Sequence, residues 1–337
     1  MYPHAKKLEE TVAKIFTHKK GILAADESNR TAGRRLSAIG LENNEDNRRK
    51  FRDLFLSTKD IEKYLSGVIL YDETFWQASL EGRPFVQSLT ERGIVPGIKV
   101  DKGLVDLPQG SGDQYTQGLD GLDARMEEYA AAGAGFAKWR AAFAIDIAKG
   151  LPSDNAIRVQ SNIFAIYAGI CQRHGVVPIV EPEVLMTGTY SIDEKYQIMK
   201  SIFTDLFLVL KKNKVYLPGV ILKTSICHSG HEAEEWADID DVADKTADLL
   251  ENYVPEELGG VVFLSGGLSK DTATKFFNAI SKNQSERMRD KTTFSFSRAI
   301  QTEPMDIWGG SDENLEKARK RYVEILKDNA LAERGKL

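Results

Sequence analysis

Residues 176–183, VVPIVEPE, form an apolar run that ends in two carboxylates, and residues 219–224, GVILKT, form a similar run that ends near a lysine. Between the two runs, residues 192–212 have helical length and alternate polar with apolar positions at helical spacing. Near-continuous apolar runs are typical of strands buried on both faces, which occur mainly in parallel sheets covered by helices. This segment therefore predicts a strand–helix–strand unit of a parallel sheet.

The same pattern extends along the chain in both directions. We expect strands at residues 21–26, 67–71, 94–101, 135–140, 176–183, 219–224, 260–265 and 292–298. We expect helices between strands at residues 123–132, 155–174, 192–212, 239–253 and 271–282. Since no linker or break in composition divides residues 1–337, the pattern predicts a single (β/α)8 TIM-barrel domain of the α/β class. An amphipathic N-terminal helix at residues 5–16 precedes it, and a long C-terminal helix from residue 311 to about residue 334 follows.

A doubly wound open sheet is the structural alternative. The first expected strand is followed by DESNRTAG, residues 26–33, and not by the glycine-rich turn of a dinucleotide-binding fold. This favours the barrel.

Composition narrows the classes of function. The chain is 42% hydrophobic and 28% charged, as folded globular proteins are, and its net charge of −5 provides no general attraction to nucleic acid or to an anionic membrane. Two cysteines are too few for a disulfide framework, and we find neither a secretory signal nor an apolar run long enough to span a bilayer. We therefore expect a cytoplasmic protein, with a mature organellar form as the alternative.

Charged side chains stand at the carboxyl ends of the expected strands, where barrel enzymes place their catalytic groups. Three pairs are two residues apart, and side chains two apart on a strand share a face. These pairs are Lys99 with Asp101, Lys138 with Arg140, and Glu181 with Glu183. Any one of these charges can mark a strand that reaches water, but a cluster of both signs within apolar runs indicates a site.

Lys223 is the strongest candidate for a nucleophile. It follows Val220-Ile-Leu directly, and apolar surroundings favour the free amine that attacks a carbonyl group to form a Schiff base. An ion pair with a nearby carboxylate is the alternative role, and Lys138 and Lys99 remain alternative nucleophiles. Glu181 and Glu183 offer paired carboxylates for proton transfer, and Asp26 supplies a third acid.

Two anion sites are predicted at the same end of the barrel. Ser265, Gly266 and Gly267 offer a hydroxyl and backbone amides at a helix start after the seventh strand, and Arg298 follows the eighth. Ser28 and Thr31, with Lys99 across the mouth, form a weaker second anion site. We expect no metal site, because His228, His231 and Glu232 lack the spacing of a tight ligand set and are typical of a loop.

Several longer motifs, in this order, resemble class I fructose-bisphosphate aldolases over nearly the whole chain. They are GILAADES at 21–28, GIKVDKG at 97–103, QGLDGL at 117–122, FAKWR at 136–140, VPIVEPE at 177–183 and FLSGG at 263–267. The resemblance implies a glycolytic and gluconeogenic lyase without metal or other cofactor. It would cleave fructose 1,6-bisphosphate reversibly to dihydroxyacetone phosphate and glyceraldehyde 3-phosphate. The family is commonly homotetrameric.

Position by position, the resemblance assigns roles to these residues. Lys223 matches the Schiff-base lysine, Glu181 the acid and base at the imine, and Asp26 the base for the C4 hydroxyl. Lys138 and Glu183 match residues that tune this centre. The remaining matches are Arg140 for a substrate contact, Ser265, Gly266 and Arg298 for one phosphate, and Ser28, Thr31 and Lys99 for the other.

The sequence departs from the family in three places. Thr-Ser-Ile-Cys follows Lys223 in place of a proline-containing run, and Phe296-Ser297 replaces the usual Tyr-Gly before Arg298. The sequence ends at Leu337, near where many relatives continue into a tail with a tyrosine that assists proton exchange on the enamine, and Tyr322 is no obvious substitute. A Schiff-base aldolase that also takes sedoheptulose 1,7-bisphosphate, and a phosphosugar-binding scaffold without catalysis, remain alternatives.

Overall fold

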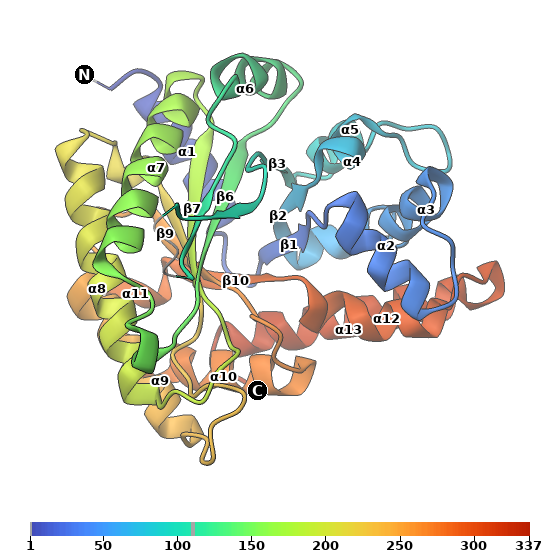
Figure 1. Ribbon diagram of the computed structural model, residues 1–337. Coiled ribbons are helices and arrows are strands. Elements are labelled where there is room, and N and C mark those ends of the chain that lie inside the picture. Colours follow the sequence, from blue (N-terminus) through green and yellow to red (C-terminus); the bar gives the residue numbers. More distant parts are fainter. Residues whose placement is uncertain (1, 109–111) are drawn as a thin grey trace.

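The computed structural model describes residues 2–108 and 112–337 and contains a closed barrel of parallel strands (Figure 1). Around the barrel the strands follow the order β1-β10-β9-β8-β7-β6-β3-β2. Their bounds are β1 Gly21–Ala25, β2 Leu65–Leu70, β3 Val95–Lys99, β6 Phe136–Phe143, β7 Val177–Val184, β8 Ile221–Thr224, β9 Gly260–Phe263 and β10 Thr292–Phe296. The predicted barrel is confirmed, with each strand near its expected position.

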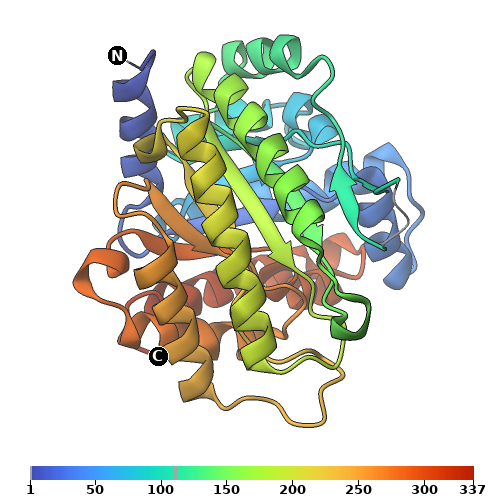
Figure 2. The same cartoon turned by 60° about the vertical axis from the view of Figure 1, so that its left-hand side comes forward.

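The helices expected between strands are present almost at their predicted bounds. They are α6 Leu122–Ala131, α7 Asp154–Arg173, α8 Ile192–Lys212, α9 Ile239–Tyr253 and α10 Lys270–Asn283. Serine or aspartate caps most of these starts, and Ser191 with Glu194 forms a full capping box at α8. Figure 2 shows the long helices α7 and α8 side by side over the outer face of the barrel.

The structure adds elements that the sequence pattern did not indicate. Helices α2 Asn29–Ala38, α3 Glu45–Leu56, α4 Asp72–Trp76 and α5 Phe85–Glu91 lie in the first third of the chain, and α11 Glu286–Arg289 and α12 Arg298–Trp308 near its end. Strands β4 Leu104–Asp106 and β5 Gln114–Thr116 form a separate antiparallel pair. Short 3-10 turns are η1 Ile61–Lys63, η2 Ile147–Lys149, η3 Leu217–Gly219 and η4 Asp312–Asn314.

Both terminal helices are present as expected. Helix α1, Ala5–Ile15, places Leu8, Val12 and Ile15 against the apolar side chains that fill the interior of the barrel. Helix α13, Leu315–Ala332, packs against α12, α10 and α3, so the end of the chain lies beside its first third (Figure 1). None of the helices in the described part of the chain is long and apolar enough to cross a membrane.

The inner faces of β6, β7 and β8 are apolar at the start of the strand and charged near its end. On β7 the interior cluster contains Val177 and Ile179, and strand alternation continues the same face to Glu181 and Glu183. Phe136 on β6 and Ile221 on β8 belong to the same cluster, and the next residues on their faces are Lys138 and Lys223. The barrel therefore holds its charged groups directly above an apolar floor.

Candidate active site

A cavity of about 790 Å³ opens at the carboxyl ends of the strands. Every site residue predicted from the sequence, except Gly267, lines it, and Glu27, Arg30, Tyr71, Asp101, Ser295 and Ser297 are among its other lining residues. The cavity wall thus carries both signs of charge, as the strand ends predicted.

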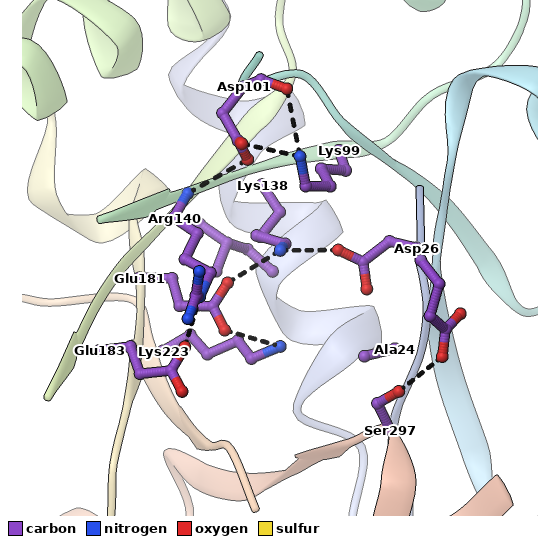
Figure 3. A network of polar contacts seen from close by, with 12 residues as sticks. Ala24, Asp26, Lys99, Asp101, Lys138, Arg140, Glu181, Glu183, Lys223 and Ser297 are labelled. Atoms are coloured by element: carbon purple, nitrogen blue, oxygen red, sulfur yellow. Dashed lines mark hydrogen bonds and ion pairs between the residues drawn. The ribbon is translucent and has the colours of Figure 1, made fainter. Parts of the chain in front are cut away.

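Three strands, β6, β7 and β8, and the residue that follows β1 bring a chain of ion pairs to the centre of the cavity (Figure 3). The Lys138 Nζ atom lies 2.6 Å from the Asp26 Oδ2 atom and 2.9 Å from the Glu181 Oε2 atom. The other oxygen of Glu181, Oε1, lies 3.1 Å from the Lys223 Nζ atom. Because Glu181 touches both lysines, it can exchange a proton with either.

Asp26, Glu181 and Lys138 hold one another in their charged forms. Burial by itself would raise the pKa of Asp26, but Lys138 and Lys223 outweigh it and hold that pKa well below its usual range. The same two lysines outweigh burial at Glu181 and lower its pKa. Burial lowers the pKa of Lys138, yet Asp26 and Glu181 raise it well above its usual range. Asp26 and Glu181 are therefore ionised bases in the resting site.

Two further ion pairs flank this centre. The Arg140 guanidinium binds the Glu183 carboxylate, and although burial opposes its charge, Glu183 raises the pKa of Arg140. The Lys99 Nζ atom lies 2.7 Å from the Asp101 Oδ1 atom, and the Asp101 Oδ2 atom accepts a bond from the Arg140 backbone amide (Figure 3). The paired spacing seen in the sequence therefore places both cations at the cavity, each held by its own carboxylate.

The residues of one predicted anion site have a local structure that differs from the prediction. Helix α10 begins at Lys270, so Ser265-Gly266-Gly267 forms a turn before the helix, and the expectation of a helix start at these residues is wrong. A helix start does lie nearby, because Arg298 is the first residue of α12. Gly267 has φ +112°, and a Cβ there would lie 2.9 Å from the Arg298 Nη2 atom. Any side chain at this position would strain the backbone and displace the end of the Arg298 side chain.

The second predicted anion site lies at the start of α2. The Ser28 hydroxyl accepts a bond from the Thr31 backbone amide, 3.3 Å away, and so caps the helix. Lys99 lines the cavity together with Ser28 and Thr31, as expected. Arg30, which the sequence analysis did not single out, adds a further cation to this lining.

Strand β10 and the residue that follows it supply two serines that sequence reasoning did not assign to the site. Ser295 lines the cavity, and its buried hydroxyl has no hydrogen-bond partner among the described residues. The Ser297 hydroxyl donates to Glu27 at 2.8 Å and accepts from Arg35 at 3.1 Å. The spacing rule that paired Glu181 with Glu183 would also have paired these two serines.

His228 and Tyr322, to which the sequence analysis gave no catalytic role, do not line the cavity. His228 is buried and stacks on Trp236, and among the described residues no group of three or more His, Cys, Asp and Glu side chains is arranged to hold a metal ion. Tyr322 is fully buried in α13 and packs on Phe55. It therefore has no access to the cavity.

Known proteins are similar to this one over nearly its whole length. The family model described as fructose-bisphosphate aldolase class-I matches residues 7–337. A probable class 1 fructose-bisphosphate aldolase of Xanthomonas axonopodis pv. citri is 42% identical over 98% of both chains. Fructose-bisphosphate aldolase 2 of Plasmodium berghei is 43% identical over 98% of this chain and 89% of its own.

A solved structure is similar over the same range. It is fructose-bisphosphate aldolase from Plasmodium falciparum in complex with TRAP and a small-molecule inhibitor. The two chains superpose with a TM-score of 0.96 at 42% identity, covering 99% of this chain and 95% of the other. With the family model, the curated relatives and this structure in agreement, the chain belongs to the class I fructose-bisphosphate aldolase family.

Proposed function

We propose that this class I fructose-bisphosphate aldolase uses Lys223 as its Schiff-base nucleophile and Glu181 as the acid and base at the imine. The observation that carries the proposal is the 3.1 Å contact between the Lys223 Nζ and Glu181 Oε1 atoms above the apolar floor of the barrel. Both side chains are about 95% buried, so a proton lost by the amine passes to the carboxylate and not to bulk water.

The cleavage follows from these positions. The free amine of Lys223 attacks the C2 carbonyl of fructose 1,6-bisphosphate, and Glu181 donates the proton with which the oxygen leaves as water. Asp26 then takes the C4 hydroxyl proton, the C3–C4 bond breaks, and its electron pair moves into the protonated imine to give an enamine. Glyceraldehyde 3-phosphate leaves at this step. Protonation of the enamine and hydrolysis of the imine release dihydroxyacetone phosphate.

Lys138 and Glu183 support this centre. Lys138 lies between the two bases, so its charge keeps Asp26 and Glu181 ionised until each receives its proton. Glu183 holds the Arg140 guanidinium at the cavity wall. We assign one substrate phosphate to Ser265, Gly266 and Arg298, with Gly267 leaving room for the arginine, and the other to Ser28, Thr31 and Lys99. Arg140 then contacts the sugar between them.

Borohydride trapping tests the nucleophile. The protein is incubated with dihydroxyacetone phosphate and EDTA and then reduced, and the added mass is located by peptide mapping. We expect the adduct on Lys223 and unchanged turnover in EDTA. An adduct on Lys138 or Lys99 would overturn the assignment but keep the reaction class, whereas ligand binding without any adduct would favour a non-catalytic scaffold.

The substrate range is tested by comparing turnover of fructose 1,6-bisphosphate with turnover of sedoheptulose 1,7-bisphosphate. The alternative of a phosphosugar-binding protein without catalysis is disfavoured, because binding alone requires only the anion sites. The cavity also holds all four of the proposed reacting and supporting groups, Lys223, Glu181, Asp26 and Lys138. Equal kcat/KM for the two sugars would extend the assignment to the longer substrate.

We also propose that residues 1–337 form one domain, that the protein is a homotetramer, and that it is cytoplasmic. The tetramer rests on the family resemblance, and light scattering on the purified protein tests it. The organellar alternative has support from a relative, because a 42% identical protein of Arabidopsis thaliana is named as chloroplastic. Cell fractionation with an antibody separates the two locations.

A further inference from the structure

Lys195, on α8, is a buried lysine outside the cavity. Its side chain is fully buried, and its Nζ atom lies 3.3 Å from the His228 Nε2 atom and 5.8 Å from the centre of the Tyr190 ring. Within residues 2–108 and 112–337, no carboxylate forms an ion pair with it. Buried lysines are rare without a counter-ion, and the amino end of a helix disfavours a cation further. The presence of a buried lysine at this position therefore requires an explanation.

The contacts of His228 show which of its ring nitrogens carries the proton. The His228 Nδ1 atom lies 2.6 Å from the Ser229 carbonyl oxygen, so Nδ1 carries the proton and Nε2 is free to accept from Lys195. The imidazole stacks between Trp236 and Phe276. Burial, together with the charge of Lys195, holds the pKa of His228 well below its usual range. His228 is therefore a neutral acceptor, and the pair holds its cation on Lys195.

His228 belongs to the segment that directly follows the nucleophile, and residues 221–230 are all buried. The Ser225 hydroxyl donates to the Val184 carbonyl at 3.1 Å and accepts from the Val184 amide at 3.2 Å. Further along, the Gly230 amide donates to the Tyr190 carbonyl at 2.8 Å, and a Cβ on Gly230 would lie 2.1 Å from the Gly188 oxygen. The segment is thus fastened at both ends to the loop that follows Glu183.

We propose that Lys195 and His228 are positioning residues for the aldolase reaction, and that their contact fixes residues 225–230 and thereby keeps Lys223 in register with Glu181. The inference rests on Lys223 being the nucleophile. The Lys195–His228 contact ties the segment that follows Lys223 to α8 by side chains, in addition to the hydrogen bonds that join it to Val184 and Tyr190.

The proton on Lys195 makes this restraint sensitive to pH. Burial lowers the pKa of Lys195 to about 8. Cys227 and Glu183 favour the charged form of Lys195, whereas His231 disfavours a charge on His228. Asp193 and Lys245 act on Cys227. Loss of the charge removes the attraction to Glu183 and the contact with the Tyr190 ring, so the restraint weakens as the pH rises through about 8.

The test uses K195M, H228F, H228Q and the double variant K195M/H228F. H228F keeps the stacking but removes the acceptor, whereas H228Q keeps an acceptor. K211M is the matched control, because Lys211 lies on the same helix α8 but is half-exposed and pairs with Glu257. For each variant, kcat and KM are measured across pH 6 to 9.5, and borohydride adducts are mapped.

We expect K195M and H228F to lower kcat about tenfold with KM changed less than about threefold, because a misplaced reacting group loses rate more than affinity. H228Q should recover most of the rate, K211M should match wild type, and the double variant should lose no more than either single variant. Wild-type kcat should fall as the pH rises through about 8, and K195M should lack this limb.

The inference is wrong if K195M and H228F both have the kcat and the pH profile of the wild-type protein. Equal losses in H228Q and H228F would also overturn it, because these show that the acceptor is irrelevant. If K195M fails to fold by circular dichroism, the comparison of H228F with H228Q decides. A wild-type adduct on a lysine other than Lys223 would instead refute the proposed nucleophile, and the two failures are therefore distinguishable.

Discussion

Replacing Lys138 with methionine removes the cation that joins the two bases of the site. Its Nζ atom lies 2.6 Å from Asp26 and 2.9 Å from Glu181, and its side chain is 4% exposed. At an effective dielectric constant of about 20, each contact corresponds to about 6 kcal/mol of Coulomb energy before desolvation is subtracted. Removing one partner of a buried ion pair costs about 3–5 kcal/mol in practice. We expect a loss of this size in the free energy of unfolding at pH 7.

The loss should depend on pH in a defined direction. Lys138 lowers the folded-state pKa of Asp26 and of Glu181 below their ordinary values of 3.8 and 4.5. Such carboxylates contribute stability that is present above the unfolded pKa and is lost as the pH falls through the folded pKa. In K138M this contribution is reduced, so the difference from wild type should be largest near pH 7 and should shrink below about pH 4.5.

Urea unfolding followed by circular dichroism, at pH 7 and at pH 4, measures both quantities. K149M is the matched control, because Lys149 pairs with Asp146 at the surface, and we expect no measurable change in it. A K138M loss below about 1 kcal/mol, or a loss equal at the two pH values, would refute the argument. Such a result would mean that Asp26 and Glu181 do not depend on Lys138 for their charge.

Three further changes test other parts of the site. In G267A the new Cβ would meet Arg298, so KM for fructose 1,6-bisphosphate should rise about tenfold, whereas G82A, also at positive φ but with open space around it, should lose stability without a change in KM. In S295A no hydrogen bond between described residues is lost, so the free energy of unfolding should change by less than about 0.5 kcal/mol while KM rises about fivefold. The assignments would be contradicted by an unchanged KM in both G267A and S295A, or by a large loss of stability in S295A. The lowered pKa of Lys195, about 8 against 10.5, opposes the charged form by about 3 kcal/mol, so stability from this group should rise between pH 8 and 10.5. The curve for K195M, measured by urea unfolding, should lack that rise, and an unchanged slope would contradict it.

Much of the barrel was predictable because burial on both faces leaves a direct mark on the sequence. Strands β7 and β8 read as continuous apolar runs, and α8 and α9 were predicted at their observed bounds. The helices of the first third lack such a mark. In α3, for example, Arg52 and Asp53 are buried with Leu54 and Phe55, because Arg52 pairs with Glu27. Charged residues on the buried face hide the apolar periodicity that identifies a helix.

By itself, the sequence determined the barrel and most of the charged side chains at the centre of its mouth, because strand alternation is a local rule that carries the face of Ile179 to Glu181 and Glu183. Only the tertiary structure decided which of these groups meet. Lys138 lies between Asp26 and Glu181 because the closed barrel brings β1 opposite β6 and β7, and Lys195 reaches His228 because the segment that follows β8 passes beside the start of α8. Contacts of this kind join residues far apart in the chain, and no local pattern of residue types records them.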